Sequence, residues 1–175
     1  GGHGSSVAAP MVRRVLEAAD VIACEDTRRT GRLLQLAGIP KRPLTVVNDH
    51  TEDGRAVELV SRAGAGELVA LVSDAGTPGI ADPGVRLVRA AIEAGVEVVA
   101  VPGPTALVSA LVVSGMATDR FVFEGFLPRK GSERAARLAG IASQERTTVL
   151  YEAPHRVLRT LGDLADHPGP LGVRH

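Results

Sequence analysis

The sequence predicts an α/β fold, in which a mainly parallel sheet is flanked by helices and a smaller C-terminal α/β domain follows. Segments with apolar residues at helical spacing alternate with short runs that are apolar throughout. Such runs are typical of strands buried on both faces, as in a parallel sheet covered by helices. In addition, two loops rich in glycine and proline each follow a predicted strand. They indicate a ligand site at one edge of the sheet.

The first elements are predicted by spacing and by capping residues. Apolar residues at positions i, i+3, i+4 and i+7 predict a helix over residues 10–19. The apolar run 21–24 then predicts a short buried strand. Asp26 or Thr27 can cap a second helix, which we expect to end at Gly38 because a proline follows soon after.

After the second helix, apolar runs and helical spacing alternate again. Each of the next two helices is closed by a glycine, Gly64 or Gly95, a residue that commonly ends helices. The remaining elements of the first domain are predicted at 44–47 (strand), 56–64 (helix), 68–72 (strand), 85–95 (helix), 96–101 (strand) and 105–114 (helix).

A second, smaller domain is predicted after a hinge at residues 115–119. The periodic pattern restarts beyond it, so we place the boundary near residue 118 and expect domains at 1–118 and 119–175. FVFEGF, at 121–126, alternates in the manner of an antiparallel strand. The other elements predicted there are a helix after LPRKGSER, a strand at 147–151 and a helix at 153–165. A segment this short buries little surface alone, and we expect this domain to be incomplete.

Composition limits the classes of function. The formal net charge is +0, so no global field draws the chain to nucleic acid or membrane. Lys41 and Lys130 are the only lysines, and the remaining basic residues are arginines. Arginine can hold phosphate through paired hydrogen bonds, although a GC-rich genome gives the same bias. The single cysteine, Cys24, excludes an internal disulfide and a cysteine zinc site. No apolar segment is long enough to span a bilayer, and we expect a cytoplasmic protein.

The two Gly/Pro loops, SDAGTPG and PGPTA, follow sequential strands, so they can face one cleft. Asp74 could contact ribose hydroxyls or a ligand ammonium. Asp82 and Thr105 stand at helix starts, where capping is the simpler interpretation of both. Neither loop matches the glycine patterns of dinucleotide or nucleoside triphosphate sites. The chain also lacks the GxSxG and HExxH catalytic motifs.

Two further stretches concentrate charge. EDTRRT contains Glu25, Asp26, Arg28 and Arg29, and PRK contains Arg129 and Lys130. Carboxylates followed by arginines suit a catalytic site, but they also suit the first turn of a solvated helix. The PRK patch could contact a phosphate backbone or could be a solvated face. The residues alone leave both interpretations open.

Five motifs occur in order along the chain: EDTRRTGRLL, LVSDAGTPGIADPG, VPGPTALVSAL, FEGFLPRKGSER and YEAPHRVLRTL. Together they resemble the family of ribosomal RNA small subunit methyltransferase I, a branch of the tetrapyrrole methylase superfamily, over roughly residues 9–165. The resemblance implies a two-domain tetrapyrrole-methylase-like fold, a homodimer, and S-adenosylmethionine (SAM) bound between the domains. The implied reaction is 2'-O-methylation of a cytidine in 16S rRNA of the small ribosomal subunit, in the cytoplasm, with no metal and no membrane.

The resemblance also implies roles for particular residues. The loop after the third strand, the start of the helix after PGP and a strand end of the second domain would contact the methyl donor. The donor-binding residues so implied are Asp74, Ala75, Gly76, Thr77, Ile80, Thr105, Ala106, Tyr151 and Glu152. We hypothesise that Glu25 or Asp26 acts as base or orients the ribose hydroxyl, with Arg28 steadying phosphate. RNA contacts are expected from Arg28, Arg29, Arg129 and Lys130.

The sequence departs from the family in two ways. The family's first strand leads into a loop bearing Pro and Gly, whereas VAAP here runs straight into a helix. The family also continues well beyond residue 165, so we expect this sequence to be part of a longer protein. The alternatives are another methyltransferase of the superfamily, acting on a precorrin or on diphthine, and a non-catalytic nucleotide- or RNA-binding module. EDTRRT and FLPRK favour the rRNA enzyme, while donor binding without methyl transfer would favour the module.

Overall fold

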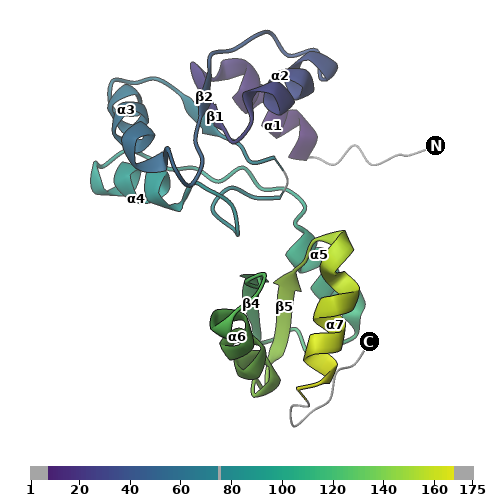
Figure 1. Cartoon of the computed structure of the whole chain (residues 1–175). Helices are drawn as coiled ribbons and strands as arrows, with labels where there is room; N and C mark the ends of the chain where they lie inside the picture. Colours follow the sequence, from purple (N-terminus) through teal and green to yellow (C-terminus); the bar gives the residue numbers. More distant parts are fainter. Residues whose placement is uncertain (1–7, 75, 168–175) are drawn as a thin grey trace, which may run out of the picture. The chain divides into compact units, whose positions relative to one another are not determined.

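The computed structural model describes residues 8–74 and 76–167, and the chain divides into two compact units (Figure 1). We call Gly1–Thr105 the N-terminal unit and Ala106–His175 the C-terminal unit. Helix α5 (Ala106–Ser114) lies between this division and the boundary expected near residue 118, and it contacts strand β5 (Thr147–Tyr151). A division into compact units does not show where independent folding begins, so the boundary near residue 118 stays a prediction.

The N-terminal unit is a parallel sheet with helices on both faces. Its elements are α1 (Ala8–Ala18), β1 (Val21–Cys24), α2 (Thr27–Leu36), β2 (Leu44–Val46), α3 (Glu52–Gly64), β3 (Val69–Leu71) and α4 (Val85–Glu93). The strands are all parallel, in the order β2-β1-β3. Each element lies within a few residues of its predicted place, which confirms the α/β class.

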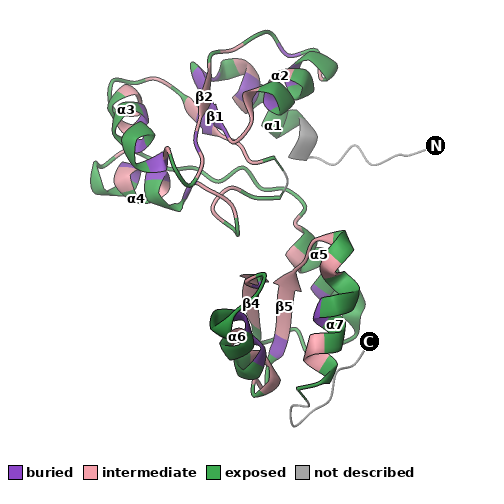
Figure 2. Cartoon of the chain, viewed as in Figure 1, coloured by how far each residue is buried: buried purple, intermediate pink, exposed green. Residues whose placement is uncertain are grey.

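The core of this unit lies on both faces of β1, which is buried at every residue (Figure 2). Successive side chains of a strand point to opposite faces. Ile22 therefore packs with α1 and α2, whereas Val21 and Ala23 pack with α3 and α4. Cys24 ends the strand and is 1% exposed. Burial raises the pKa of its thiol, and a hydrogen bond with Thr30 offsets this only in part.

One predicted strand does not form. Residues 96–101 pair with no strand in the described part of the chain and are mostly exposed, with Val98 at 45% and Val99 at 73%. An apolar run favours a strand, but a strand also needs a neighbour for its backbone hydrogen bonds. Within residues 8–74 and 76–167, the sheet ends at β3. The strand prediction for 96–101 is therefore wrong.

The C-terminal unit holds a two-stranded sheet with helices around it. Its elements are α5, β4 (Phe121–Phe126), α6 (Ser132–Ala142), β5, the short 3-10 helix η1 (Pro154–Arg156) and α7 (Val157–Ala165). Strands β4 and β5 are parallel, with an irregularity between Phe123 and Gly125. The antiparallel character expected for FVFEGF is wrong, because α6 connects the two strands and returns the chain to the same direction.

A buried arginine ties the helices of the C-terminal unit together. Arg134 of α6 is 5% exposed and donates to Asp163 of α7 at 2.6 Å. It also donates to the Thr160 hydroxyl at 3.0 Å and to the Pro128 carbonyl at 3.0 Å. Thr160 in turn donates to Glu152 at 2.7 Å. The hydrogen bond from Arg134 is the main cause of a lowered pKa at Asp163. These bonds join α6, α7 and the segment after β5.

Candidate functional site

The loop between β3 and α4, residues 72–84, has a backbone that depends on glycine. Gly84 has a φ of 131°, and a Cβ there would lie 2.7 Å from Leu71 Cδ2. A side chain at this position would be strained at this φ and would displace the end of the Leu71 side chain. Ala81 has a φ of 59°, in the left-handed region that residues with a Cβ rarely adopt. Backbone strain of this kind gathers at ligand-binding segments, which supports the interpretation of this loop as a ligand loop.

Glu52 fixes the end of this loop where α4 begins. Its side chain is buried, and Oε1 accepts hydrogen bonds from three main-chain N–H groups. The donors are Gly84 at 3.1 Å, Arg86 at 2.8 Å and Leu87 at 3.0 Å. These are groups that a helix start leaves without partners. Asp82 is thus not the cap that the sequence suggested, because a carboxylate from α3 already occupies that role.

Three carboxylates gather at the carboxyl ends of β1 and β3. Glu25 Oε1 accepts a hydrogen bond from the Asp74 main-chain N–H at 3.0 Å. Arg29 Nη1 lies 3.1 Å from Asp74 Oδ2. Burial raises the pKa of Asp82, and the negative charges of Glu25 and Asp74 raise it further. Even with Arg29 paired to Asp74, carboxylates outnumber the paired cation in this group, which suits a positively charged ligand.

Asp26 has a structural task in the same region. It is the N-cap of α2 and accepts main-chain hydrogen bonds from Arg28 at 2.8 Å and Arg29 at 3.4 Å. The Arg28 side chain also reaches its carboxylate at 3.3 Å. These bonds lower the pKa of Asp26, and the bond from the Arg28 side chain has the largest effect. Of the two possible caps, Asp26 and Thr27, the structure selects Asp26.

The other residues implied for donor binding fall in both units. Gly76, Thr77 and Ile80 lie exposed in the β3–α4 loop of the N-terminal unit, whereas Ala75 lies outside the described residues. Thr105 ends the N-terminal unit and Ala106 begins α5.

Glu152, at the end of β5, is engaged within the C-terminal unit. Its side chain is 6% exposed. Oε1 accepts from the Ala153 N–H at 2.8 Å and pairs with Arg156 at 2.5 Å, while Oε2 accepts from Thr160 at 2.7 Å. Burial favours a higher pKa for Glu152, but these bonds outweigh it and the pKa is lowered. A ligand beside Glu152 and Tyr151 would meet their main chain or the tyrosine ring, since the carboxylate is already occupied.

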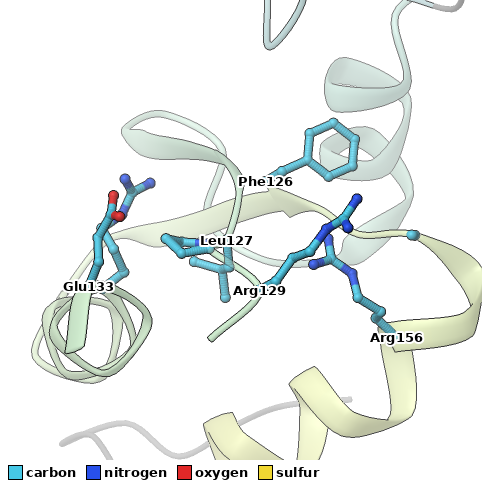
Figure 3. Close-up of a pocket in the computed structure, with 8 residues that line it drawn as sticks. Phe126, Leu127, Arg129, Glu133 and Arg156 are labelled. Carbon is cyan, nitrogen blue, oxygen red and sulfur yellow. The ribbon is translucent and has the colours of Figure 1, made fainter. Parts of the chain in front are cut away.

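The PRK patch lies beside an open groove of the C-terminal unit. Arg129 and Lys130 are exposed and make no ion pair with other described residues. Arg129 lines the groove together with Phe126 and Arg156, as Figure 3 shows. Arg156 was not among the residues selected from the sequence, since nothing local distinguishes it from the other arginines.

Replacing Asp82 with asparagine is expected to raise the melting temperature at neutral pH. Because the folded pKa is raised, ionised Asp82 penalises the folded chain at neutral pH, and the penalty disappears as pH falls through that pKa. Melting curves followed by circular dichroism from neutral to acidic pH would check this. The exposed Asp49→Asn variant is the control. A lower melting temperature for Asp82→Asn at pH 7 would contradict the expectation.

Membrane-spanning helices and metal-binding clusters are absent from the described residues. No helix in residues 8–74 and 76–167 is long and apolar enough to cross a membrane. Within the same ranges, no group of three or more His, Cys, Asp or Glu side chains is arranged to hold a metal ion.

Comparison with known proteins places these features in a family. The family model for tetrapyrrole (corrin/porphyrin) methylases matches residues 8–173. The chain is 54% identical over 155 residues to ribosomal RNA small subunit methyltransferase I of Synechocystis sp., covering 89% of this chain and 55% of that protein. Proteins of the same name from Xylella fastidiosa and Mycobacterium tuberculosis are 50% and 45% identical, each covering 94% of this chain, and 60% and 58% of their own length. The chain thus spans a little over half the length of these relatives. It belongs to the tetrapyrrole (corrin/porphyrin) methylase family.

Proposed function

We propose that the protein is a SAM-dependent methyltransferase that methylates the 2'-hydroxyl of a cytidine ribose in 16S rRNA. The observation that carries this is the similarity, at 45–54% identity, to proteins named ribosomal RNA small subunit methyltransferase I. We further propose that it acts on the small ribosomal subunit in the cytoplasm, as a homodimer. A domain division near residue 118 is part of the same proposal.

The chemistry of the β3–α4 loop fits a cationic methyl donor. SAM carries a positive sulfonium, and Glu25, Asp74 and Asp82 provide negative charge where it would bind. In this proposal Asp74 contacts the donor, with Ala75, Gly76, Thr77 and Ile80 beside it. Thr105 and Ala106 of the PGPTA segment, and Tyr151 and Glu152 of the C-terminal unit, complete the proposed set.

SAM, when bound, supplies an electrophilic methyl group, so orienting the ribose and removing its proton are the tasks left to the chain. A lowered pKa makes Asp26 a weak proton acceptor, so we favour Glu25 of the two carboxylates that the sequence suggested. Asp82 joins it as a candidate, because a raised pKa strengthens a carboxylate as a base. Arg28 and Arg29 would contact RNA phosphate, as would Arg129 and Lys130.

Replacing Asp74 with alanine is expected to weaken SAM binding at least tenfold, about 1.4 kcal/mol, because it removes a charged contact to the donor. Calorimetric titration of the chain and the variant would measure this. Asp53→Ala is the matched control, since Asp53 is 77% exposed on α3 and lies outside the loop. Equal SAM affinities for the unaltered chain and Asp74→Ala would contradict the assignment of the donor site.

Methyl transfer itself needs a second assay. Labelled SAM and small ribosomal subunits would show incorporation at a cytidine 2'-hydroxyl, which Glu25→Gln should reduce without equal loss of donor binding. Donor binding with no transfer to subunits would favour the non-catalytic module. Transfer to a precorrin or to diphthine would favour another branch of the superfamily.

A further inference from the structure

The groove of the C-terminal unit combines features that the proposed function does not yet use. It has a volume of about 540 Å³, within the range of small-ligand sites. Phe126 ends β4, Arg129 follows it in the PRK segment, and Arg156 belongs to η1 after β5. The groove therefore lies where the parallel strands β4 and β5 both end. All its lining residues belong to this one unit.

Arginines outnumber carboxylates among the residues that line the groove. Three arginines and one glutamate line it: Arg129, Arg137, Arg156 and Glu133. Arg137 is paired with Glu124, and Arg156 with Glu152, whereas Arg129 has no ion pair among the described residues. Figure 3 shows the guanidinium groups of Arg129 and Arg156 directed toward each other. Two like charges in this arrangement favour an anion between them.

Arg156 adds an unsatisfied donor. Its side chain is 19% exposed, and Nη1 is buried without a hydrogen-bond acceptor in the described part of the chain. A buried donor without an acceptor is costly and uncommon in folded proteins. Glu152 engages the other terminal nitrogen, Nη2. The guanidinium is thus held in place by Glu152, while Nη1 is covered by protein atoms and its hydrogen-bonding capacity is unused.

An aromatic ring stands beside these arginines. Phe126 is 50% exposed, and its ring contacts Tyr151 at a centroid distance of 5.6 Å. Tyr151 in turn contacts Phe123 at 5.0 Å, edge to face. The exposed ring of Phe126 therefore rests against Tyr151, which in turn rests against Phe123. The chain has too few aromatic residues for a broad stacking surface, but one supported ring is enough for one base.

We propose that this groove binds one unpaired nucleotide of RNA, with its phosphate between Arg129 and Arg156 and its base stacked on Phe126. The proposal rests on the proposed function, since an RNA substrate brings such a nucleotide to the protein. It adds Phe126 and Arg156 to the residues that contact RNA. It also states what kind of RNA is held here, because only an unpaired base can leave its neighbours to stack on a side chain.

The test is binding of a fluorescently labelled single-stranded RNA to the full chain, measured by anisotropy at several salt concentrations without methyl donor. Phe126→Leu is expected to weaken binding about fivefold or more, through lost stacking. Arg129→Gln is expected to weaken binding and to reduce the slope of log affinity against log salt by about 0.7, the value for one single-strand phosphate. Both side chains are exposed, so folding should be unaffected, and circular dichroism would verify this.

Matched controls exist on the same unit. Phe121, 40% exposed, begins the strand that Phe126 ends, and Arg146 is exposed and outside the groove. Phe121→Leu and Arg146→Gln should leave RNA affinity unchanged. Equal affinity in all four variants would overturn the proposal, as would absence of RNA binding by the unaltered chain. Equal binding of a duplex of the same sequence would also overturn it.

The outcome is independent of the donor titration described above. If donor binding depends on Asp74 but RNA binding does not depend on Phe126 or Arg129, the proposal for the groove is wrong and the proposed function stands. If RNA binding depends on Phe126 and Arg129 but the chain does not bind SAM, the proposal for the groove stands and the proposed function is contradicted.

Discussion

Glu52→Ala is expected to lower the free energy of unfolding of the N-terminal unit by about 3 kcal/mol or more. One carboxylate oxygen accepts three main-chain hydrogen bonds at the start of α4. Removing it leaves these N–H groups without a partner, two of them on buried residues, Gly84 and Leu87. Each buried donor that loses its acceptor costs about 1–3 kcal/mol. Glu52→Gln keeps an acceptor oxygen and loses only the charge, so its loss should be smaller.

The control for this prediction is Glu58→Ala on the same helix. Glu58 is 45% exposed and forms a surface ion pair with Arg55 at 2.7 Å, so its removal should cost less than about 0.5 kcal/mol. Denaturation followed by circular dichroism gives the stability, and hydrogen exchange of the α4 amides gives the location. Equal losses for Glu52→Ala and Glu58→Ala would contradict the role assigned to Glu52.

Arg134→Ala is expected to destabilise the C-terminal unit by about 3 kcal/mol or more, because it removes a buried guanidinium together with its hydrogen bonds to Asp163, Thr160 and Pro128. It leaves Asp163 without its closest cation, and it removes the donors to Thr160 and to the Pro128 carbonyl. The bonds from Arg134 to Asp163 and Thr160 join α6 to α7. In a unit of this size, a loss on this scale is expected to unfold much of the population at room temperature.

Tyrosine fluorescence reports unfolding of the C-terminal unit alone, because Tyr151 is the only tyrosine in the sequence and there is no tryptophan. The matched control is Arg159→Ala. Arg159 lies 3.9 Å from the same Asp163 but is 63% exposed, and its loss should cost less than about 0.5 kcal/mol. A C-terminal unit that melts at the same denaturant concentration in both variants would show that Arg134 is not the tie between the helices.

The N-terminal sheet could be predicted from sequence because its signals are local. The apolar run 21–24 is buried on both faces, and the helices on either side carry their own spacing and caps. Asp26 could be proposed as a cap because it stands directly before the helix it serves. Glu25 and Asp74 could be expected at one edge because parallel strands end together.

The features that escaped prediction depend on partners far away in sequence. Glu52 acts on a helix that begins more than thirty residues later, and no local pattern marks a carboxylate as a remote acceptor. The direction of β4 and the absence of a strand at 96–101 depend on which segment pairs with which. Alternation and apolarity describe faces of a strand and contain no information on its neighbours.

The buried position of Cys24 makes the chain suited to site-selective chemistry. Alkylating reagents attack the thiolate, and a side chain that is 1% exposed with a raised pKa presents almost none. A single cysteine introduced on the surface, for example at Val57 in α3 or Leu158 in α7, would therefore carry a label alone. The native thiol can stay in place, and the core around β1 need not be altered to prepare such a protein.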